Sequence, residues 1–415
     1  AIYAAMGLAG FAFLALAGVS GIVIPQKVAM AANSFPLLAA PLFILMGNLM
    51  NAAGISYRIF DFAKAIVGWM RGGLAQANIV GSVIFAGMSG SAVADAAGLG
   101  TVEIEAMQRE GFAPETAAAV TAASATIGPI IPPSLPMIVY GVAAETSIGA
   151  LFLAGVIPGL LMAGALMLMV RHLAIRRNLP RHPFEGGRVL WTAFRRAFWA
   201  LLMPVILLGG IYGGIFTPTE AAAVALVVAI FVGLFIHKDL KFREIGKVLV
   251  QQSVTTGVVV LMVIFVLILS RIMTMQNIPQ DMIQFVTDLT ENKYLTLLMV
   301  NVFLIFLGMI VDDFTGTLLA APLLFPLMQH LGVHPVHFAA ILGTNLGLGN
   351  VTPPMAPILY LAGRLGNVTI DKMIKPALIF MVFGAVPVVL ITTYWPDLSL
   401  WLPTLVMPKL MGSGG

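Results

Sequence analysis

The chain of 415 residues is 60% hydrophobic and only 10% charged, with a mean hydropathy of +1.00 and a formal net charge of +4. Soluble globular domains carry about 25% charged residues, so this composition excludes an ordinary soluble domain and indicates a polytopic membrane protein. The absence of cysteine excludes disulfides and thiol catalysis, and the six histidines form no metal-ligand motif. Because the sequence offers no metal cluster and no nucleophile–base pair, we do not expect an enzyme. We also expect no nucleic-acid partner.

Apolar segments long enough to span a bilayer, which takes about 20 helical residues, recur along the chain. The strong candidates are Phe35–Met50, Ile148–Val170, Phe198–Tyr212, Ala221–Ile236, Val248–Met273 and Lys375–Tyr394. Tyr3–Val19 is a partial candidate. The apolar regions 74–109, 113–144 and 294–364 are interrupted by Gly, Ser, Pro and Thr, which predicts broken helices. Residues 412–415, Gly-Ser-Gly-Gly, are typical of an appended linker and are set aside.

Basic residues predict how these segments cross the membrane. The segment 171–196 holds seven arginines and a single acidic residue, so the positive-inside rule places it in the cytoplasm. Two predicted helices later, a second basic loop at 238–247 returns to the same side. The acidic segment 275–292 then falls outside, and the same count puts the C-terminus in the periplasm. We therefore expect a multi-pass protein of a bacterial inner membrane.

The same count predicts two re-entrant hairpins of opposite orientation. Residues 74–109 start and end on the inside, so they form a hairpin with its tip near Ser89-Gly90-Ser91. Residues 294–330 enter from the outside and form a second hairpin, with its tip near Asp312–Gly316. Glu103 and Glu105, at the inner end of the first hairpin, are expected to be solvated.

An internal repeat supports this topology independently. Pro132-Pro133-Ser134-Leu135-Pro136 matches Pro353-Pro354-Met355-Ala356-Pro357 at an offset of 221 residues (353 − 132), and Gly128 and Gly87 meet Gly349 and Gly308 at the same offset. Short amphipathic stretches, about 55–70 and 276–291, precede the two hairpins. Inverted repeats with interrupted helices are the signature of secondary transporters. The predicted fold is an all-α membrane protein of two inverted-topology repeats, each with a re-entrant hairpin and a discontinuous helix.

The hairpin tips and helix breaks carry the residues suited to binding. Prolines after glycine free backbone carbonyls, which together with Ser and Thr hydroxyls and a carboxylate suit Na⁺, while helix N-termini at the same breaks suit an anion. Asp312 and Asp313 are functional candidates because carboxylates inside a membrane segment are costly. Asp95 either caps the first hairpin or contributes to binding. Glu220, after Thr217-Pro218-Thr219, fits an acid in the first turn of a helix.

Several motifs together resemble the large membrane subunit of TRAP (tripartite ATP-independent periplasmic) transporters, and the resemblance covers nearly the whole chain. They are Ser34-Phe35-Pro36-Leu37-Leu38-Ala39, Gly47-Asn48-Leu49-Met50-Asn51, Gly90-Ser91-Ala92-Val93-Ala94-Asp95, Ile131-Pro132-Pro133-Ser134, Phe216-Thr217-Pro218-Thr219-Glu220-Ala221 and Thr352-Pro353-Pro354. The family's first helix begins earlier, so the N-terminus here resembles one that is truncated or separated from a fused small subunit. The second hairpin is also more acidic than the family pattern, which leaves the ion stoichiometry open.

The resemblance implies Na⁺-driven import of an organic acid by an elevator motion. The partners that it implies are a small four-helix membrane subunit, a periplasmic substrate-binding protein, a small anionic substrate and membrane lipid. The implied Na⁺ ligands are Ser89, Gly90, Ser91, Gly128, Ile131 and Pro132 in the first half and Asp312, Asp313, Thr315, Gly316, Gly349 and Thr352 in the second. The implied substrate residues are Ser91, Ser134, Thr317 and Asn345.

The resemblance also divides the chain into scaffold and transport segments. These are 1–73 (N-terminal scaffold helices and amphipathic arm), 74–144 (first transport half), 145–292 (scaffold helices, basic loop and second arm), 293–364 (second transport half) and 365–411 (C-terminal scaffold helix).

The sequence leaves alternatives open for the transported substrate and for the transport mechanism. The run Ala96-Ala97-Gly98-Leu99-Gly100, with Glu103 and Glu105, resembles the sialic-acid branch, and C4-dicarboxylates and sugar acids are the next candidates. A stand-alone Na⁺/carboxylate symporter that needs no binding protein is the main alternative. A channel is disfavoured because the sequence has no ring of pore-lining charges and no repeated filter.

Overall fold

The computed structural model describes residues 2–17, 21–179 and 181–411, and within these ranges every regular element is a helix. The predicted all-α class is confirmed. In the first half the helices are α1 (Ile2–Leu16), α2 (Val23–Ala32), η1 (Phe35–Leu38), α3 (Ala39–Ala52), α4 (Ile55–Val67), α5 (Gly73–Ser89), α6 (Ala92–Gly98), α7 (Gly100–Arg109), α8 (Pro114–Ala125), α9 (Leu135–Ala143) and α10 (Ile148–Arg176).

The second half follows two linking helices. These are α11 (Gly187–Tyr212) and α12 (Pro218–Phe231), the latter continued by the π-helical turn η2 (Val232–His237). The remaining helices are α13 (Phe242–Met275), α14 (Ile278–Leu289), α15 (Lys293–Ile310), α16 (Asp313–His330), α17 (Pro335–Gly349), α18 (Pro357–Leu365), α19 (Ile370–Phe380), η3 (Met381–Ala385), α20 (Val386–Tyr394), α21 (Asp397–Val406) and α22 (Pro408–Met411). Residues 412–415, which were expected to be an appended linker, lie outside the described part of the chain.

Seven helices in the described residues are long and apolar enough to cross a membrane. They are Phe35–Ala52, Ile148–Arg176, Gly187–Tyr212, Pro218–His237, Phe242–Met275, Lys293–Ile310 and Ile370–Tyr394. Six of them extend the strong candidates from the sequence, and the seventh is α15, an arm of the second hairpin. Glu220 closes a capping box with Thr217 at the start of α12, as expected of a first-turn acid.

The order of elements repeats along the chain. An amphipathic helix, a helical hairpin, a half-helix, a proline break, a second half-helix and a long apolar helix run from α4 to α10, and the same series runs from α14 to α20. The hairpins are α5 with α6–α7 and α15 with α16. Both breaks contain a cis Pro-Pro peptide, at Pro132-Pro133 and Pro353-Pro354. The internal repeat in the sequence is therefore a repeat of structural elements.

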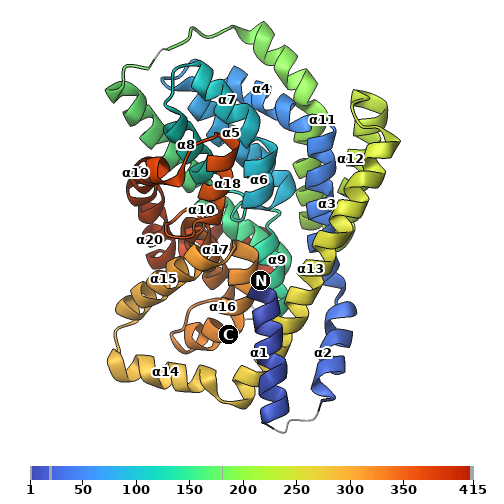
Figure 1. The fold of residues 1–415 in the computed structure, drawn as a ribbon, viewed down its shortest axis with the longest axis vertical. Helices are drawn as coiled ribbons and strands as arrows, with labels where there is room; N and C mark the ends of the chain where they lie inside the picture. The colour runs from blue at the N-terminus through green and yellow to red at the C-terminus, as the bar shows by residue number, and fades with distance from the viewer. Residues whose placement is uncertain (1, 18–20, 180, 412–415) are drawn as a thin grey trace.

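The two repeats point their amphipathic arms to opposite ends of the molecule. In Figure 1, α4 lies at the top together with the connections α10–α11 and α12–α13, whereas α14 lies at the bottom. Both basic loops thus share one end, and the acidic segment containing α14 occupies the other. This arrangement agrees with the opposite orientations inferred from the charges.

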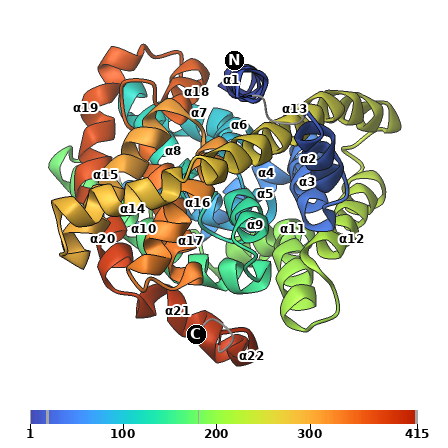
Figure 2. The same cartoon turned by 90° about the horizontal axis from the view of Figure 1, so that it is seen from below.

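The helices pack as a flank and a core. Helices α1–α3 and α11–α13 contact one another along one side, and Figure 2 shows α2, α3, α11 and α12 grouped there. Half-helices from the two repeats interlock in the core, where α8 packs on α18 and α19, α9 on α16, and α10 on α17. The long helices α10 and α19–α20 contact these core elements.

Some boundaries differ from the sequence expectation. Most of the segment 171–196 is helical, because α10 continues to Arg176 and α11 begins at Gly187. Long arginine side chains can extend from the end of an apolar helix into water, so a run of arginines does not end a helix. Helices α2 and α21, each of 10 residues, were not expected, because both are too short to register as spans.

Candidate functional site

The first hairpin tip is joined to the first helix break by backbone contacts. Helix α5 ends at Gly90, whose φ of +63° is the left-handed conformation that glycine tolerates. The Leu135 N–H donates to the Gly90 carbonyl at 3.2 Å. A Cβ at Gly90 would lie 2.1 Å from the Pro133 carbonyl oxygen, and one at Gly128 would lie 3.0 Å from the Ser91 carbonyl carbon. Glycine at these two positions lets tip and break meet.

The serine hydroxyls at this junction differ in what they bind. Ser91 caps α6 by accepting from the Ala94 N–H at 3.4 Å. The buried Ser134 hydroxyl accepts from the Met137 N–H at 3.3 Å and donates to the Pro129 carbonyl. Ser89 is buried, and its hydroxyl has no hydrogen-bond partner in the described part of the protein. Of these hydroxyls, Ser89 is the one left free to bind an ion.

The second tip and break meet in a similar way. A Cβ at Gly349 would lie 2.6 Å from the Gly308 Cα, so the two backbones are in direct contact. Asn350, with its amide oriented to satisfy its neighbours, donates to the Gly308 and Val311 carbonyls at 3.2 and 3.0 Å and accepts from the Asp313 N–H at 3.2 Å. Asn350 was not among the predicted site residues, although its place directly after Gly349 in the break could have marked it.

The predicted residues of the second tip surround the start of α16. The turn falls at Val311-Asp312, and residues 313–316 form the first helical turn. Asp312 caps the helix by accepting from the Thr315 N–H at 2.8 Å. Thr317 is buried and donates to the Asp313 carbonyl at 2.8 Å. Gly316 packs against the Leu346 side chain, where a Cβ would lie 2.8 Å from a Leu346 methyl carbon.

The other predicted residues lie further from the tips or face other helices. The Thr352 hydroxyl donates to the Leu348 carbonyl at 2.8 Å. Ile131 packs on α10, where a Cβ at Gly159 would lie 2.4 Å from its side chain. The Pro132 carbonyl oxygen lies 4.0 Å from a Cβ built on Gly87.

Asn345 lies away from both hairpin tips. It is fully buried between α15 and α17, and its amide donates to Asn301 Oδ1 at 2.9 Å and to the Ile341 carbonyl at 2.8 Å. Of the four predicted substrate residues, only Ser91 is partly exposed.

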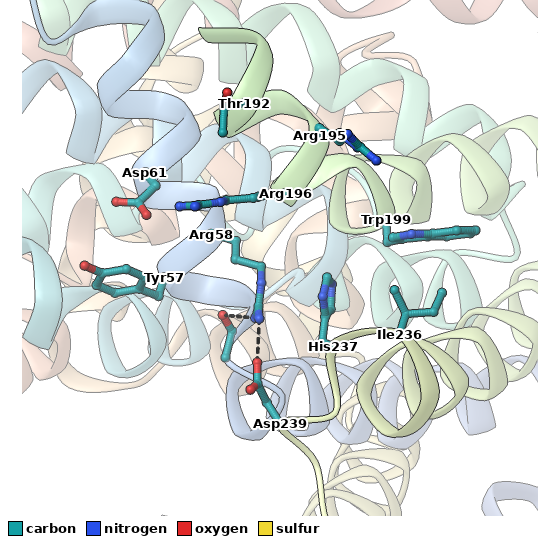
Figure 3. Close-up of a pocket in the computed structure, with 11 residues that line it drawn as sticks. Tyr57, Arg58, Asp61, Thr192, Arg195, Arg196, Trp199, Ile236, His237 and Asp239 are labelled. Atoms are coloured by element: carbon teal, nitrogen blue, oxygen red, sulfur yellow. Dashed lines mark hydrogen bonds and ion pairs between the residues drawn. The ribbon is translucent and has the colours of Figure 1, made fainter. Parts of the chain in front are cut away.

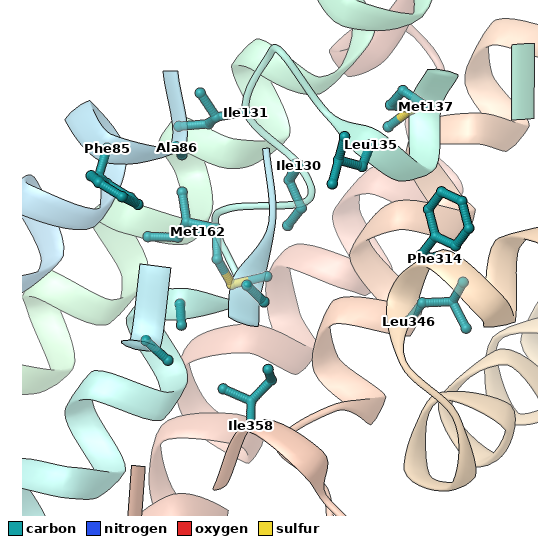
Figure 4. Packing of buried hydrophobic residues seen from close by; sticks show 14 of the residues in the cluster. Phe85, Ala86, Ile130, Ile131, Leu135, Met137, Met162, Phe314, Leu346 and Ile358 are labelled. Carbon is teal, nitrogen blue, oxygen red and sulfur yellow. The ribbon is translucent and has the colours of Figure 1, made fainter. Parts of the chain in front are cut away.

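The two junctions lie side by side in the core. A Cβ at Gly347 would lie 3.2 Å from the Thr126 carbonyl oxygen, and one at Gly343 would lie 3.1 Å from the Met137 methyl group. Figure 4 shows Ile130, Leu135 and Met137 of the first break in the same packed region as Phe314 and Leu346 of the second repeat. Each tip–break junction is therefore packed against residues of the other repeat.

A cavity of about 800 Å³ lies away from the hairpin tips, at the end of the molecule that carries the basic loops. Figure 3 shows its lining from α4, α11 and the α12–α13 connection. There Arg58 forms an ion pair with Asp239 at 2.5 Å and also donates to the Gly54 carbonyl at 3.0 Å. These contacts join the start of the α4 arm to the loop before α13.

The expectation that Glu103 is solvated is wrong. Glu103 is only 1% exposed, whereas Glu105 is exposed and forms an ion pair with Arg109 at 2.6 Å. Asp95 is equally buried, and neither of its carboxylate oxygens accepts a hydrogen bond of standard geometry in the described residues, although the Ser82 hydroxyl of the opposite hairpin arm lies beside the carboxyl.

No cluster of three His, Asp or Glu residues that could hold a metal ion occurs in the described ranges. An ion at either junction would therefore be held by backbone carbonyls and hydroxyls, with at most one or two carboxylates.

Paired hairpins that meet broken helices within a repeated set of membrane-spanning helices define a secondary transporter. The family model described as "Tripartite ATP-independent periplasmic transporter, DctM component" matches residues 1–398. The chain belongs to this family, the large permease proteins of TRAP transporters, as its sequence motifs predicted. The family is tripartite, so the permease acts together with a small membrane subunit and a periplasmic binding protein.

Named relatives are transporter permeases. The chain is 41% identical over 402 residues to the sialic acid TRAP transporter large permease protein SiaM of Vibrio cholerae, covering 95% of this chain and 93% of that protein. It is 38% identical to the sialic acid TRAP transporter permease protein SiaT of Haemophilus influenzae, covering 92% of this chain but 62% of that longer protein. It is 38% identical to the C4-dicarboxylate permease DctM of Pseudomonas aeruginosa, covering 89% and 86%.

A solved structure shares the fold. The Alcanivorax borkumensis YdaH transporter, described as having an unusual topology, superposes with a TM-score of 0.58 at 14% identity, covering 86% of this chain and 85% of the other. At this identity the likeness concerns the fold alone.

Proposed function

We propose that this permease imports sialic acid in symport with Na⁺, after a periplasmic binding protein delivers the substrate. The observation that carries the proposal is the pair of tip–break junctions, one in each repeat, built from close backbone contacts at Gly90 and Gly349. Such junctions gather carbonyls and hydroxyls that suit a monovalent cation, together with helix N-termini that suit a carboxylate. The buried, unpartnered Ser89 hydroxyl supports an ion site at the first junction.

Sialic acid is favoured as the substrate by the identity to the Vibrio cholerae protein, which is named for it. A C4-dicarboxylate is the next candidate, because a dicarboxylate permease is similar over nearly the same length. Ser91 is the leading residue for contact with the substrate, since it is partly exposed at the tip. The tripartite family disfavours the stand-alone symporter.

An elevator motion is the proposed mechanism. The moving unit would consist of the hairpins and half-helices within 74–144 and 293–364, on which the scaffold helices α10 and α19–α20 pack. The flank of α1–α3 and α11–α13 would stay fixed. An apolar cavity of about 250 Å³ separates Phe314 in the second hairpin from α13 residues such as Val263, and an apolar boundary allows sliding without breaking polar contacts.

The proposed orientation puts the basic loops in the cytoplasm of a bacterial inner membrane and α14 in the periplasm. The chain has no cysteine, so single cysteines can be placed freely. A membrane-impermeant maleimide applied to intact spheroplasts should label Asp288→Cys and spare Glu185→Cys. The reverse pattern would invert the topology.

The decisive test of function is uptake of labelled sialic acid into proteoliposomes that contain the permease and its small subunit, under an inward Na⁺ gradient. Uptake that needs both Na⁺ and the binding protein is expected. Uptake with Na⁺ alone would support the stand-alone symporter. Uptake of C4-dicarboxylates in place of sialic acid would overturn the substrate assignment and leave the mechanism standing.

A further inference from the structure

The returning arm of the first hairpin buries two carboxylates that no junction uses. Asp95 on α6 and Glu103 on α7 are each 1% exposed. Three of their oxygens, Asp95 Oδ1 and Oδ2 and Glu103 Oε1, are buried, and in the described part of the chain none of them accepts a hydrogen bond of standard geometry. Burying an unpaired carboxylate in a membrane segment is costly and marks a functional group.

The two carboxylates face neighbouring residues of α5, Asp95 beside Ser82 and Glu103 against Gly81. The Leu99 N–H donates to the Asp95 carbonyl at 2.9 Å and the Glu103 N–H to the Leu99 carbonyl at 3.1 Å, so Asp95 and Glu103 share one face of a continuous helical stretch. The Ser82 hydroxyl lies beside the Asp95 carboxyl. Glu103 Oε1 lies over Gly81, 3.1 Å from where a Cβ would stand. The two acids therefore converge on adjacent residues of the opposite arm.

No basic side chain of the described residues forms an ion pair with either acid. The three ion pairs in the described residues are Arg58–Asp239, Arg109–Glu105 and His182–Glu110, and none involves either acid. The Asn78 amide donates one N–H to Thr121 at 2.8 Å and accepts from Ser124 at 2.5 Å, and neither acid is among its hydrogen-bond partners in the described residues. Among the described side chains, the Ser82 hydroxyl is the polar group that lies beside the pair.

A bound cation satisfies this arrangement best. A proton shared between the acids would serve only two oxygens and would leave a third acceptor unpaired. A hard monovalent cation is coordinated by several oxygens at once, including carboxylates and a hydroxyl. We propose that Asp95, Glu103 and Ser82 form a Na⁺ site inside the first hairpin, separate from the ion sites at the two tip–break junctions. The inference deepens the proposed function, because an ion held there travels with the hairpin.

Equilibrium binding of ²²Na⁺ to the purified permease with its membrane partner tests the site without any need for substrate. Glu103→Gln and Asp95→Asn keep the side-chain shapes and should each lower the bound Na⁺ by one ion per permease. Glu105→Gln, two residues away and exposed, should leave the wild-type stoichiometry. Size-exclusion profiles and melting temperatures establish that each variant is folded.

A second variant leaves both carboxylates in place. Gly81→Ala puts a methyl group against Glu103 Oε1 and should weaken the binding of one Na⁺ at least several-fold, even where the amide variants fold poorly. Wild-type Na⁺ stoichiometry and affinity in both Glu103→Gln and Gly81→Ala would overturn the inference. Unchanged Na⁺ binding together with a changed pH dependence of uptake would show that the two acids share a proton, and this result would overturn it as well. A wild-type protein that binds no Na⁺ would instead overturn the Na⁺ coupling in the proposed function.

Discussion

The Leu135 N–H donates to the Gly90 carbonyl at 3.2 Å, which ties the tip of the first hairpin to the helix that restarts after the Pro-Pro break. A side chain at Gly90 would collide with the Pro133 carbonyl oxygen. The geometry of the first ion junction therefore depends on the absence of a Cβ at one position.

Gly90→Ala should abolish Na⁺-dependent uptake and lower the melting temperature. Alanine at positive φ costs about 1–2 kcal/mol, and the overlap with Pro133 forces the tip away from the break in addition. Gly111→Ala is the matched control, because Gly111 also has a positive φ of +89° but open space around its Cβ position. We expect the control to lose stability only modestly and to keep its Na⁺ dependence. Wild-type uptake by Gly90→Ala would show that tip and break need not touch.

Two buried serines beside that junction should give different phenotypes. Ser89→Ala removes a hydroxyl with no protein partner, so we expect little change in melting temperature and a several-fold higher Na⁺ concentration for half-maximal uptake. Ser134→Ala removes a helix cap, which costs about 1 kcal/mol, so the melting temperature should fall while the Na⁺ requirement stays close to wild type. Measuring both quantities for both variants separates ion binding from capping. Identical Na⁺ curves for Ser89→Ala and wild type would remove Ser89 from the ion site.

Asp312→Asn tests the charge at the second tip apart from its capping role. Asparagine caps helices about as well as aspartate, so the bond to the Thr315 N–H can persist while the negative charge is lost. We expect a folded protein whose uptake is reduced at least tenfold and is less steeply dependent on Na⁺. Glu220→Gln makes the same change in the capping box of α12 in the flank and should leave transport intact. Normal Na⁺ dependence in Asp312→Asn would confine Asp312 to a structural role.

Much of the architecture could be predicted from the sequence, because a membrane imposes few choices. Interrupted apolar segments must be hairpins or broken helices, and the Pro-Pro runs and glycines near Gly90 and Gly349 set where they break. The positions of the basic loops predicted that the two amphipathic arms, α4 and α14, lie at opposite ends of the molecule. Short helices such as α2 were not predicted, because a membrane-spanning segment is recognised in a sequence by about 20 consecutive apolar residues and these helices are shorter.

The side-chain environments could not be predicted in the same way. Glu103 and Glu105 look alike in the sequence, yet one is buried and the other exposed. The difference arises from α5, where Gly81 leaves room for the Glu103 carboxyl across the hairpin. The contact of Asn345 with Asn301 likewise depends on the packing of α17 against α15. Such tertiary contacts are not encoded in the local pattern.

A cysteine pair across the flank–core boundary tests the elevator motion. Phe314 at the start of α16 and Val263 on α13 line the same apolar cavity of about 250 Å³, and the chain has no native cysteine to interfere. Cross-linking Phe314→Cys to Val263→Cys with a short thiol-cleavable reagent should stop uptake, because the second hairpin can then no longer slide past α13. Reduction should restore it.

The matched control joins two positions in the flank that line the same cavity. Leu37→Cys with Val263→Cys places both thiols on elements that stay together in an elevator motion, so cross-linking should leave uptake unchanged. The reagent, the chemistry and one of the two sites are common to both pairs. The comparison therefore isolates relative movement from chemical damage. Full uptake by protein in which the Phe314–Val263 pair is cross-linked would mean that substrate crosses without movement of the second hairpin against α13, which the elevator mechanism forbids.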